Sequence, residues 1–492
     1  MYPELSHFTK EHPLRSEDKM PSLNLFRAIT TSLLLACTFS DSSHASPPLT
    51  SDLPPLSKVA LLLDANTGET GEISLAARLQ SLSLAKRSVR IQALIFTGDE
   101  TGLKVAEILK QKKKQDPKMD IRIIVDAASN LGWQTQWMYY DLKMNHIEVE
   151  GYEALYQQGI NEINPLKPLE VNMRYHDKMW IIDGEDETEG SAVVGGLNVA
   201  NEYFRVPQDA KMRWRDQDVM IKGPIVKDVV NTFDNNFLAL KKIKKKNIAI
   251  NTDKTWKFWN KVVDKVGYIA PHFSSDKANQ GALNFALGRE LNLNWQPAKM
   301  WFIQNRPRLN ESYILQEYLQ LIKSASHAGG EIQIANAYFV PEPEIRQALK
   351  NAVKAGAQVT VLTNSLETND LPPLTYASRY LFEELITAGI KIYEYAGQNY
   401  NEGTIHAKFA VFDRKISLVG SYNLDARSQK LNSETVLVFE NTELSETLSD
   451  FFREKDLRKS TFITKEQAAH WHTPSGYDSL QMQLSNALTP LL

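Results

Sequence analysis

Residues 176–183 read HDKMWIID, and residues 406–413 read HAKFAVFD. Both segments carry a histidine, a lysine two residues later and an aspartate five residues after the lysine. A short segment ending in asparagine follows each copy, GGLN at 195–198 and GSYN at 420–423. One such histidine-lysine pattern is a weak signal, because most are ordinary surface or core sequence. Two complete copies in the same order predict an internal duplication with one site shared between its halves.

Alternation within each copy predicts an extended strand. His176, Lys178 and Trp180 would point to one face of such a strand, and the apolar residues around them would form its buried body. The second copy repeats the pattern with His406 and Lys408. We therefore expect the histidine and the lysine of each copy to project toward a common site.

Each strand is expected to return as a hairpin. The second copy turns and continues with the apolar run ISLV at 416–419, which leads into Gly420, Ser421 and Asn423. Glycine at this point would let the backbone approach a ligand closely. The first copy has the same order, but its turn at 184–190 is longer and acidic.

These residue types suit the cleavage of a phosphodiester. A phosphodiester is anionic, so an enzyme needs a nucleophile, an acid for the leaving alkoxide, and cations or donors on the other oxygens. Two histidines can supply the nucleophile and the acid, while lysines and asparagines supply charge and hydrogen bonds. The motif histidines come with lysines, which repel a cation, so we expect no metal and no other cofactor.

The two motifs resemble those of the phospholipase D superfamily, whose signature is HxKxxxxD followed by GSxxN or GGxN. The first half, with GGLN and with WRD at 214–216, is similar to cardiolipin synthases and related bacterial phospholipase D-like proteins. The resemblance covers roughly residues 56–455. It implies an α/β fold in which two α-β-α sandwich halves form one pseudo-two-fold body.

The resemblance also implies roles for the motif residues. His176 would attack phosphorus and form a phosphohistidine, and His406 would protonate the leaving group and then activate the incoming hydroxyl. The sequence alone leaves open which histidine attacks. The phosphate would be held by Lys178, Lys408, Asn198 and Asn423, with a further hydroxyl from Ser421.

Four acidic residues complete the expected site. Asp216 and Glu434 lie at matching places after the two glycine motifs and would orient the histidines from behind. Asp183 and Asp413 belong to the catalytic signature, and we expect them to pin the two hairpins.

The acceptor of the phosphatidyl group decides the activity. The GGxN and WRD details favour phosphatidyl transfer, so the resemblance predicts a phosphatidyltransferase that forms cardiolipin. The alternatives are a phospholipase D hydrolase that releases phosphatidic acid, a nuclease with the same site, and a non-catalytic binding protein. A net charge of −3 provides no basic footprint, so we expect a phospholipid substrate rather than nucleic acid. The oligomeric state stays open.

The N-terminal region is expected to direct export. Residues 25–37, LFRAITTSLLLAC, place one arginine before a short apolar run, which is typical of a secretory signal. The run ends in Cys37, the only cysteine, where a bacterial lipobox would be lipidated. Cleavage after Ala45 and a leader without function are the alternatives, and Met20 is a second candidate start. We expect a bacterial cell-envelope protein that is lipid-anchored or peripheral to the membrane.

Apolar patterns of the same order occur in both halves. Strand, helix and strand are predicted at 89–96, 102–114 and 121–125, and again at 331–339, 343–355 and 358–363. Short connections of this kind favour parallel pairing in an α/β sheet.

A length of 492 residues leaves room for two or three domains. We expect a leader and tether at 1–57, a first half at 58–240, a connecting segment at 241–300, a second half at 301–460 and a C-terminal tail at 461–492. The sequence has no internal run of about 18 or more uncharged apolar residues. We therefore do not expect a multi-span membrane protein. Three segments could contact a membrane, and each has an alternative. The lysines at 241–246 could instead belong to a solvated linker, and the aromatic residues at 133–140 could pack in the core. The leucine-rich C-terminal tail could dock onto the body of the protein.

Overall fold

The computed structural model describes most of the chain beyond residue 55. The described residues are 56–64, 70–127, 129–152, 173–204, 206, 214–246, 261, 277–306, 309–396, 403–472 and 477–488. They belong to one compact unit. Met20, Cys37 and Ala45 lie outside the described residues, so the export signal and the lipidation stay predictions.

The first half alternates strands and helices before the motif hairpin. Its first elements are β1 (Ser57–Leu61), α2 (Gly71–Leu84), β2 (Ser88–Ala93), α3 (Glu100–Gln115), β3 (Asp120–Asp126), α4 (Trp133–Met144) and β4 (Glu148–Tyr152). The motif region follows with β5 (Arg174–Tyr175), β6 (Met179–Ile182), β7 (Ser191–Gly195), α6 (Asn201–Phe204), β8 (Trp214–Arg215), β9 (Asp218–Lys222) and α7 (Val226–Lys246). Helix α9 (Lys277–Gly288) precedes the second half.

The second half repeats this order. Its first elements are β10 (Gln296–Asn305), α10 (Tyr313–Ser324), β11 (Glu331–Asn336), α11 (Pro343–Lys354), β12 (Gln358–Asn364), α12 (Pro372–Thr387) and β13 (Lys391–Tyr395). The motif region follows with β14 (Thr404–Ile405), β15 (Lys408–Phe412), β16 (Ile416–Gly420), α13 (Ala426–Lys430), β17 (Asn432–Glu440) and α14 (Thr442–Phe451). A π-helical turn (Phe452–Asp456), a 3₁₀ turn (Leu457–Lys459), β18 (Ser460–Phe462), α15 (Lys465–Trp471) and α16 (Tyr477–Leu488) end the chain.

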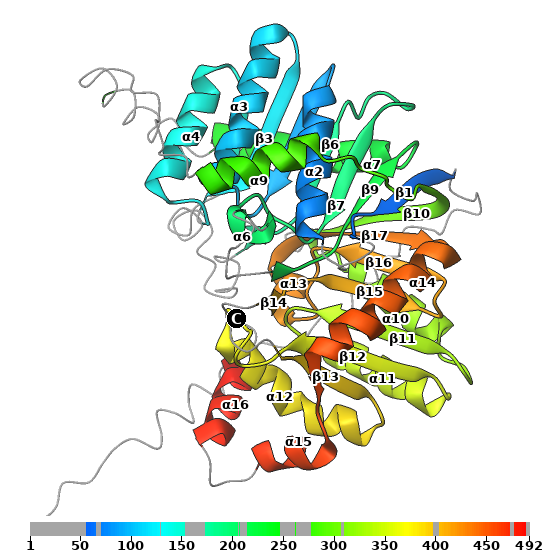
Figure 1. The fold of residues 1–492 in the computed structure, drawn as a ribbon. Coiled ribbons are helices and arrows are strands. Elements are labelled where there is room, and N and C mark those ends of the chain that lie inside the picture. Colours follow the sequence, from blue (N-terminus) through cyan, green and yellow to red (C-terminus); the bar gives the residue numbers. More distant parts are fainter. Residues whose placement is uncertain are drawn as a thin grey trace, which may run out of the picture. The chain divides into compact units, whose positions relative to one another are not determined.

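One continuous sheet contains strands of both halves (Figure 1). The strand order is β18-β13-β12-β11-β15-β16-β17-β10-β1-β9-β7-β6-β2-β3-β4. Read outward from the centre, β1-β9-β7-β6-β2-β3-β4 matches β10-β17-β16-β15-β11-β12-β13. This correspondence of strands is the expected pseudo-two-fold relationship. The parallel pairing predicted for both halves is also confirmed, since β2 pairs with β3 and β11 with β12 in parallel.

The halves join where β1 pairs with β10. The pairing is antiparallel and short, with Ser57 opposite Ala298 and Val59 opposite Gln296. Helix α7 continues past position 240, and β10 begins before position 301, so regular structure extends into both ends of the expected connecting segment.

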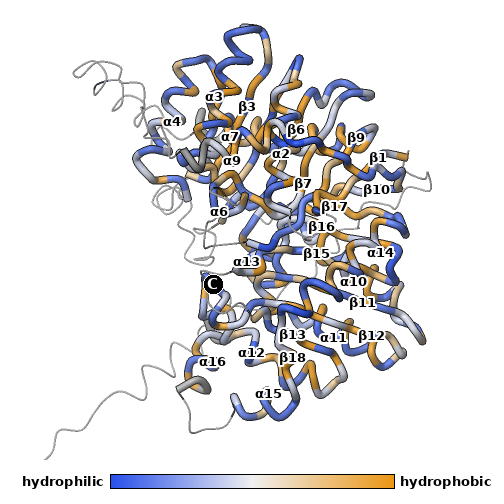
Figure 2. Tube along the Cα trace, viewed as in Figure 1, coloured by the Kyte–Doolittle hydropathy of each residue, from blue (hydrophilic) through white to orange (hydrophobic). Residues whose placement is uncertain are grey.

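A hydrophobic core on one sheet face runs through both halves. Helix α7 places Val226, Val229, Phe233 and Phe237 on one side at helical spacing, and these side chains are buried. They share a cluster with Leu444 of α14 and with strand residues of both halves. Figure 2 shows apolar residues concentrated along the strands. Burial in one shared core stabilises the two halves as a single body.

Several features that could have contacted a membrane pack against the protein. Tyr139 and Tyr140 of α4 are buried, as is Trp137, whereas Trp133 is 64% exposed. The lysine run at 241–246 ends α7, and Lys241 forms an ion pair with Glu148. The described part of the C-terminal tail docks on the second half, because β18 pairs with β13 and α15 and α16 pack against α12. Among the described residues, no helix has the length and apolarity needed to span a bilayer.

Candidate active site

Two hairpins place the motif residues at matching positions. β6 pairs with β7, and β15 pairs with β16, both antiparallel. Each motif histidine lies just before the first strand of its hairpin, so the strand is shorter than expected: β6 begins after Lys178, and β15 begins at Lys408. The sequence prediction of two motif hairpins is therefore confirmed.

Each histidine is bonded to a carboxylate from the other half. His176 Nδ1 lies 2.8 Å from Glu434 Oε2, and His406 Nδ1 lies 2.5 Å from Asp216 Oδ2. All four side chains are buried. A hydrogen bond from Nδ1 to a carboxylate fixes the ring and leaves Nε2 as the nitrogen that can react.

Two short parallel strand pairs produce this crosswise arrangement. β5 pairs with β17 so that Tyr175 is opposite Ser433, one residue before His176 and Glu434. β8 pairs with β14 so that Arg215 is opposite Ile405, one residue before Asp216 and His406. The same relation therefore occurs twice, once on each side of the pseudo-two-fold axis.

Glycine makes room for one of these carboxylates. A side chain at Gly196 would overlap the carboxylate of Asp216, and one at Gly195 would overlap Asp218. The sequence predicted close approach of a ligand at Gly420, but a side chain there would overlap the backbone of Thr435 and Val436 of the protein itself. At the position equivalent to Gly196 in the second half, the Ser421 hydroxyl donates to Glu434 Oε2 at 2.5 Å.

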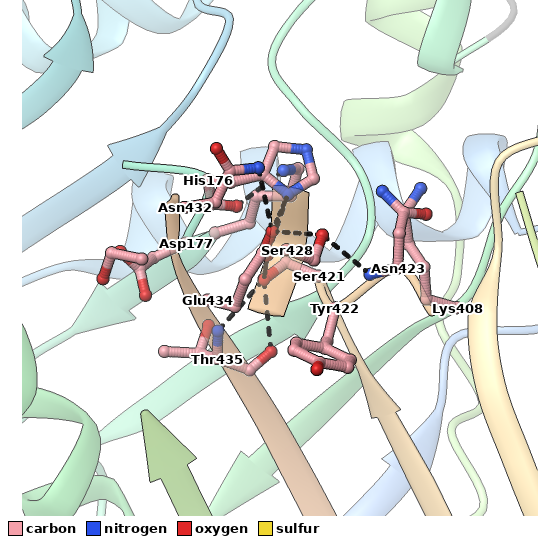
Figure 3. A network of polar contacts seen from close by, with 12 residues as sticks. His176, Asp177, Lys408, Ser421, Tyr422, Asn423, Ser428, Asn432, Glu434 and Thr435 are labelled. Carbon is pink, nitrogen blue, oxygen red and sulfur yellow. Dashed lines mark hydrogen bonds and ion pairs between the residues drawn. The ribbon is translucent and has the colours of Figure 1, made fainter. Parts of the chain in front are cut away.

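Glu434 is the centre of a buried polar network (Figure 3). Besides His176, its carboxylate accepts hydrogen bonds from the Ser428 hydroxyl at 2.8 Å and from Asn432 Nδ2 at 3.2 Å. The Ser421 hydroxyl, expected to contact phosphate, is fully buried and directs its hydrogen to Glu434 instead. In this geometry Ser421 positions the carboxylate that positions His176.

The two motif lysines lie beneath the histidines. Lys178 Nζ donates to the carbonyl oxygen of His176 at 2.7 Å, and Lys408 Nζ donates to that of His406. Burial is the largest influence on both ammonium groups, lowering the pKa of Lys178 to about 7 and that of Lys408 to about 8. Neither lysine lines the cavity described below.

A cavity of about 330 Å³ opens between the halves at the two histidines. Its walls come from both halves, and they combine polar and apolar side chains. They include Leu94, Ile95, Ser129, Arg174, His176, Asn198, Tyr203, Trp214, Tyr338, Asp370, Leu371, Leu374, His406, Asn423, Asp425, Arg427 and Asn432. One cavity that holds both histidines is the shared site that the repeated motif predicted.

The two motif asparagines both line this cavity. Asn198 is held by its own neighbours, since Oδ1 accepts from the Ile95 amide at 3.1 Å and Nδ2 donates to the Tyr203 hydroxyl at 2.9 Å. The Oδ1 atom of Asn423 is buried and has no hydrogen-bond partner within the described part of the chain. The Asn423 amide therefore retains hydrogen-bonding capacity for a ligand.

Burial favours the neutral form of both histidines. The pKa of His176 is well below its usual value, first because of burial and then because Lys178, Lys408 and Arg427 are close. The pKa of His406 falls to about 4, also chiefly through burial. A neutral imidazole whose Nδ1 hydrogen is held by a carboxylate presents a lone pair on Nε2.

The two carboxylates differ in their electrostatics. Burial raises the pKa of Glu434 to about 7. Burial acts in the same direction on Asp216, but the charge and hydrogen bond of His406 outweigh it, and the pKa of Asp216 is lowered. Asp216 thus stays ionised and is the better partner for a protonated histidine, which favours His406 as the acid.

Asp183 and Asp413 lie in the hairpin turns, away from the cavity. The Asp183 carboxylate accepts hydrogen bonds from the backbone amides of Lys86, Arg87 and Ser88. Asp413 accepts from the Glu331 amide at 2.9 Å. Both have positive φ, 49° and 51°. This geometry agrees with the expected pinning of the hairpins and places neither aspartate near the reacting atoms.

The sequence analysis did not predict that several further residues line the cavity. The rings of Trp214 and Tyr203 lie 4.8 Å and 5.4 Å from the His406 ring. Arg174 and Arg427 also line the cavity. Trp214 could have been found from its place in the WRD segment, and Arg174 from alternation with His176. No local pattern marks Tyr203 or Arg427.

An ion pair between the halves supports the His406 side. Arg215 binds Asp456 through two contacts of 3.0 Å, from Nε to Oδ1 and from Nη2 to Oδ2. Asp456 ends the π-helical turn, and the backbone oxygen of Arg215 accepts from the amide of His406 at 2.8 Å. The paired arginine therefore helps to hold β8 beside His406.

Comparison with known proteins places the chain in a family. Residues 79–237 and 318–456, more than half of the chain, match a family model described as "Cardiolipin synthase, PLD-like domain". The chain belongs to this family. The match covers both motif regions, so the suspected relationship to phospholipase D-like proteins is confirmed.

Individual family members are similar along most of the chain. The cardiolipin synthase of Halalkalibacterium halodurans is 27% identical over 424 residues, which cover 86% of this chain and 71% of that protein. Cardiolipin synthase 2 of Bacillus cereus is 26% identical over 442 residues, which cover 88% of this chain and 72% of that protein.

A solved structure supports the fold. The phosphatidylserine synthase of Haemophilus influenzae Rd KW20 superposes with a TM-score of 0.57 at 13% identity, covering 89% of this chain and 98% of that one. The likeness confirms the predicted fold class of two phospholipase D-like halves.

In this family member, the site residues separate into three sets. The histidines and asparagines line the cavity, while the lysines and the carboxylates Asp216 and Glu434 lie behind the histidines. The two aspartates of the signature lie in the turns. Within the described part of the chain, no group of three or more His, Cys, Asp or Glu residues is arranged to hold a metal ion.

Proposed function

We propose that the protein is a phosphatidyltransferase that forms cardiolipin from two molecules of phosphatidylglycerol through a phosphohistidine intermediate. The observation that carries the proposal is one cavity with two histidines, each bonded through Nδ1 to a carboxylate of the opposite half. Membership of the cardiolipin synthase family and the cardiolipin synthases among its relatives support the choice of product.

The first step transfers the phosphatidyl group to the protein. Nε2 of His176 attacks phosphorus, and the bond from phosphorus to the headgroup glycerol oxygen breaks. Protonated His406 gives its proton to that oxygen, so free glycerol leaves. Although burial lowers the pKa of His406, the ionised Asp216 and the bound phosphodiester both favour its protonated form.

The second step returns the phosphatidyl group to a lipid. His406, now neutral, takes the proton from a primary hydroxyl of a second phosphatidylglycerol. The hydroxyl oxygen attacks phosphorus, and the bond to His176 breaks. Cardiolipin forms, and both histidines return to their starting states, so no metal or redox cofactor is needed to balance the reaction.

The remaining motif residues stabilise charge during these steps. Lys178 and Lys408 lie directly behind the histidines, where their positive charge offsets the charge that develops on the phosphoryl oxygens. Asn198 and Asn423 reach the cavity and can bind those oxygens or the headgroup. Asp216 and Glu434 orient the imidazole rings.

Water is the competing acceptor, and its use would make the protein a phospholipase D hydrolase. The cavity favours transfer, because apolar and aromatic side chains such as Leu94, Leu371, Leu374 and Trp214 form part of its wall. Such a wall disfavours a free water molecule at the phosphohistidine. Nuclease activity is the more distant alternative, and the net charge of −3 does not favour it.

The proposal is tested by product analysis. Purified protein is incubated with labelled phosphatidylglycerol in vesicles, and cardiolipin is separated from phosphatidic acid. We expect cardiolipin as the main product, with glycerol released in equal amount and phosphatidic acid as a minor product. Phosphatidic acid as the main product at high phosphatidylglycerol would identify a hydrolase, and comparable cleavage of DNA would identify a nuclease.

We further propose that the protein acts at the membrane of the bacterial cell envelope. A phospholipid substrate requires access to a membrane surface, and the apolar run before Cys37 supports export and lipid anchoring. Mass spectrometry of the mature N-terminus tests this part. A lipidated Cys37 is expected, whereas an unmodified start at Ser46 would show cleavage after Ala45.

A further inference from the structure

The cavity is lined by two arginines in addition to the motif residues that occur in both halves. Arg174 lies on β5, two residues before His176, and Arg427 lies on α13 of the second half. Both line the cavity beside His176. The charge of Arg427 acts on His176, and the charge of Arg174 acts on Arg427.

Neighbouring groups of the protein hold this cationic pair in place. The Arg174 side chain is 7% exposed, and its Nε lies 3.7 Å from Asp126 Oδ2, a long distance for an ion pair. Its Nη1 donates to the carbonyl oxygen of Met173 at 2.8 Å. Burial, followed by repulsion from Arg174, lowers the pKa of Arg427, although Asp425, Glu434 and Asp126 act in the opposite direction.

The pair breaks the pseudo-two-fold symmetry of the site. Arg174 precedes its motif histidine by two residues, and the equivalent residue before His406 is Thr404. Arg427 follows its motif asparagine by four residues, and the equivalent residue after Asn198 is Glu202. The histidines, lysines and asparagines occur twice, whereas the two cavity arginines occur only on the His176 side.

A second anion in the reaction explains this asymmetry. In the proposed mechanism, the reacting phosphodiester lies at the duplicated histidines and asparagines. Hydrolysis of one phospholipid brings no other phosphate into the cavity. Transfer between two phosphatidylglycerol molecules brings a second phosphate, joined to the attacking hydroxyl by a single glycerol unit.

We propose that Arg174 and Arg427 form a second phosphate subsite, which binds the phosphodiester of the acceptor phospholipid while its glycerol hydroxyl attacks the phosphohistidine. The inference rests on the proposed transferase function and assigns a binding site for its second substrate. Arginine suits this task because its planar guanidinium binds two phosphate oxygens at once. Binding the acceptor through its phosphate also favours a lipid hydroxyl over water.

Two soluble acceptors of different charge test the subsite. Glycerophosphoglycerol is the deacylated acceptor and carries the phosphodiester, while glycerol offers the same hydroxyl without it. The protein is given phosphatidylglycerol in detergent micelles, and kcat/KM is measured for transfer to each acceptor. Both acceptors are radiolabelled, because transfer to glycerol forms phosphatidylglycerol again and is seen only as label entering the lipid. We expect wild-type protein to prefer glycerophosphoglycerol, and Arg427→Gln to reduce that preference about tenfold or more.

The preference is the ratio of kcat/KM for glycerophosphoglycerol to kcat/KM for glycerol. A change in the reactivity of His176 alters both values equally and therefore does not change the ratio. Arg427→Lys keeps the charge and should recover part of the preference. Glu202→Gln at the equivalent position of the first half is the matched control and should leave the ratio unchanged. Arg174→Gln should act like Arg427→Gln, with its folding checked by thermal unfolding because Arg174 is buried.

The outcomes separate the subsite from the proposed function. Cardiolipin formation by wild type together with an unchanged preference in Arg427→Gln would overturn the subsite and leave the function in place. An equal loss with both acceptors would also overturn it, by placing the arginines on the donor or on the shared chemistry. If wild-type protein made phosphatidic acid but no cardiolipin, the proposed function itself would fail.

Discussion

Glu434 in the second half accepts a hydrogen bond from Nδ1 of His176 in the first half, at 2.8 Å, although 258 residues separate them in the chain. The equivalent contact between His406 and Asp216 is 2.5 Å long and runs in the opposite direction between the halves. Neither half therefore contains a complete histidine-carboxylate pair. The two histidine-carboxylate pairs form only when both halves are folded and joined.

The carboxylates should be needed for turnover but not for folding. We expect Glu434→Gln and Asp216→Asn each to lower kcat about 10²–10⁴-fold, because the amide no longer holds the Nδ1 hydrogen of its histidine. Steady-state cardiolipin formation and thermal unfolding are the measurements. Glu440→Gln, an exposed change on the same strand as Glu434, is the control. A kcat within threefold of wild type in either variant would contradict the pairing.

The two histidines should fail at different steps. His176→Ala and His406→Ala should each abolish cardiolipin formation, and exposed His470→Ala should not. With a phosphatidyl p-nitrophenol donor, whose leaving group needs no acid, His406→Ala should still form the phosphohistidine. Intact-protein mass spectrometry should then show one phosphatidyl adduct, on His176. An adduct in His176→Ala but not in His406→Ala would reverse the two roles.

Asp183 should stabilise the fold rather than the transition state. Asp183→Ala removes hydrogen bonds to three backbone amides and leaves a non-glycine residue at a φ of 49°, so we expect a loss of about 4 kcal/mol in unfolding free energy. Asp413→Ala should lose less, because its carboxylate accepts from one backbone amide. Urea unfolding tests the order. The folded fraction should keep kcat within about threefold, and a larger loss would assign Asp183 to catalysis.

Asp177 should make stability depend on pH. Burial raises its pKa from 3.8 to about 7, so the folded state binds more protons than the unfolded state between about pH 4 and pH 7. Its stabilising contribution is therefore complete below about pH 4 and is lost as the pH rises toward 7 and above. Asp177→Asn, which does not titrate, should be more stable than wild type at pH 8, by roughly 4 kcal/mol at most, and similar to it at pH 4.

Unfolding midpoints across this pH range measure the effect. The control is Glu454→Gln, an exposed change of the same kind. A stability difference between Asp177→Asn and wild type that stayed constant from pH 4 to pH 8 would show that Asp177 is not the titrating group.

Catalysis should not depend on a metal ion. Each motif histidine is bonded to one carboxylate and has a lysine directly behind it, a donor set that repels a divalent cation. Activity on micellar phosphatidylglycerol should therefore survive EDTA. Loss of activity with EDTA and its return with one divalent ion, without a change in the micelles, would contradict this mechanism.

Local patterns were sufficient to predict the motif strands, the repeated order of strands and helices and the parallel pairing. The reason is that alternation and helical spacing depend on neighbouring residues, such as those at 179–182, although β6 begins only after His176 and Lys178. The two motif copies alone also predicted one shared site, without any knowledge of how the strands pair. The role of Ser421 was harder to predict, because its hydroxyl could point to a ligand or to a carboxylate.

The sequence by itself determined the duplication, the two candidate histidines and the expectation of one site between two halves. The tertiary structure decided which carboxylate bonds to which histidine, that neither lysine lines the cavity, and that Arg174 and Arg427 line the same cavity. These relations join residues far apart in the chain. They depend on the β1–β10 junction and on two short parallel strand pairs, and no local pattern of residues specifies how such distant segments meet.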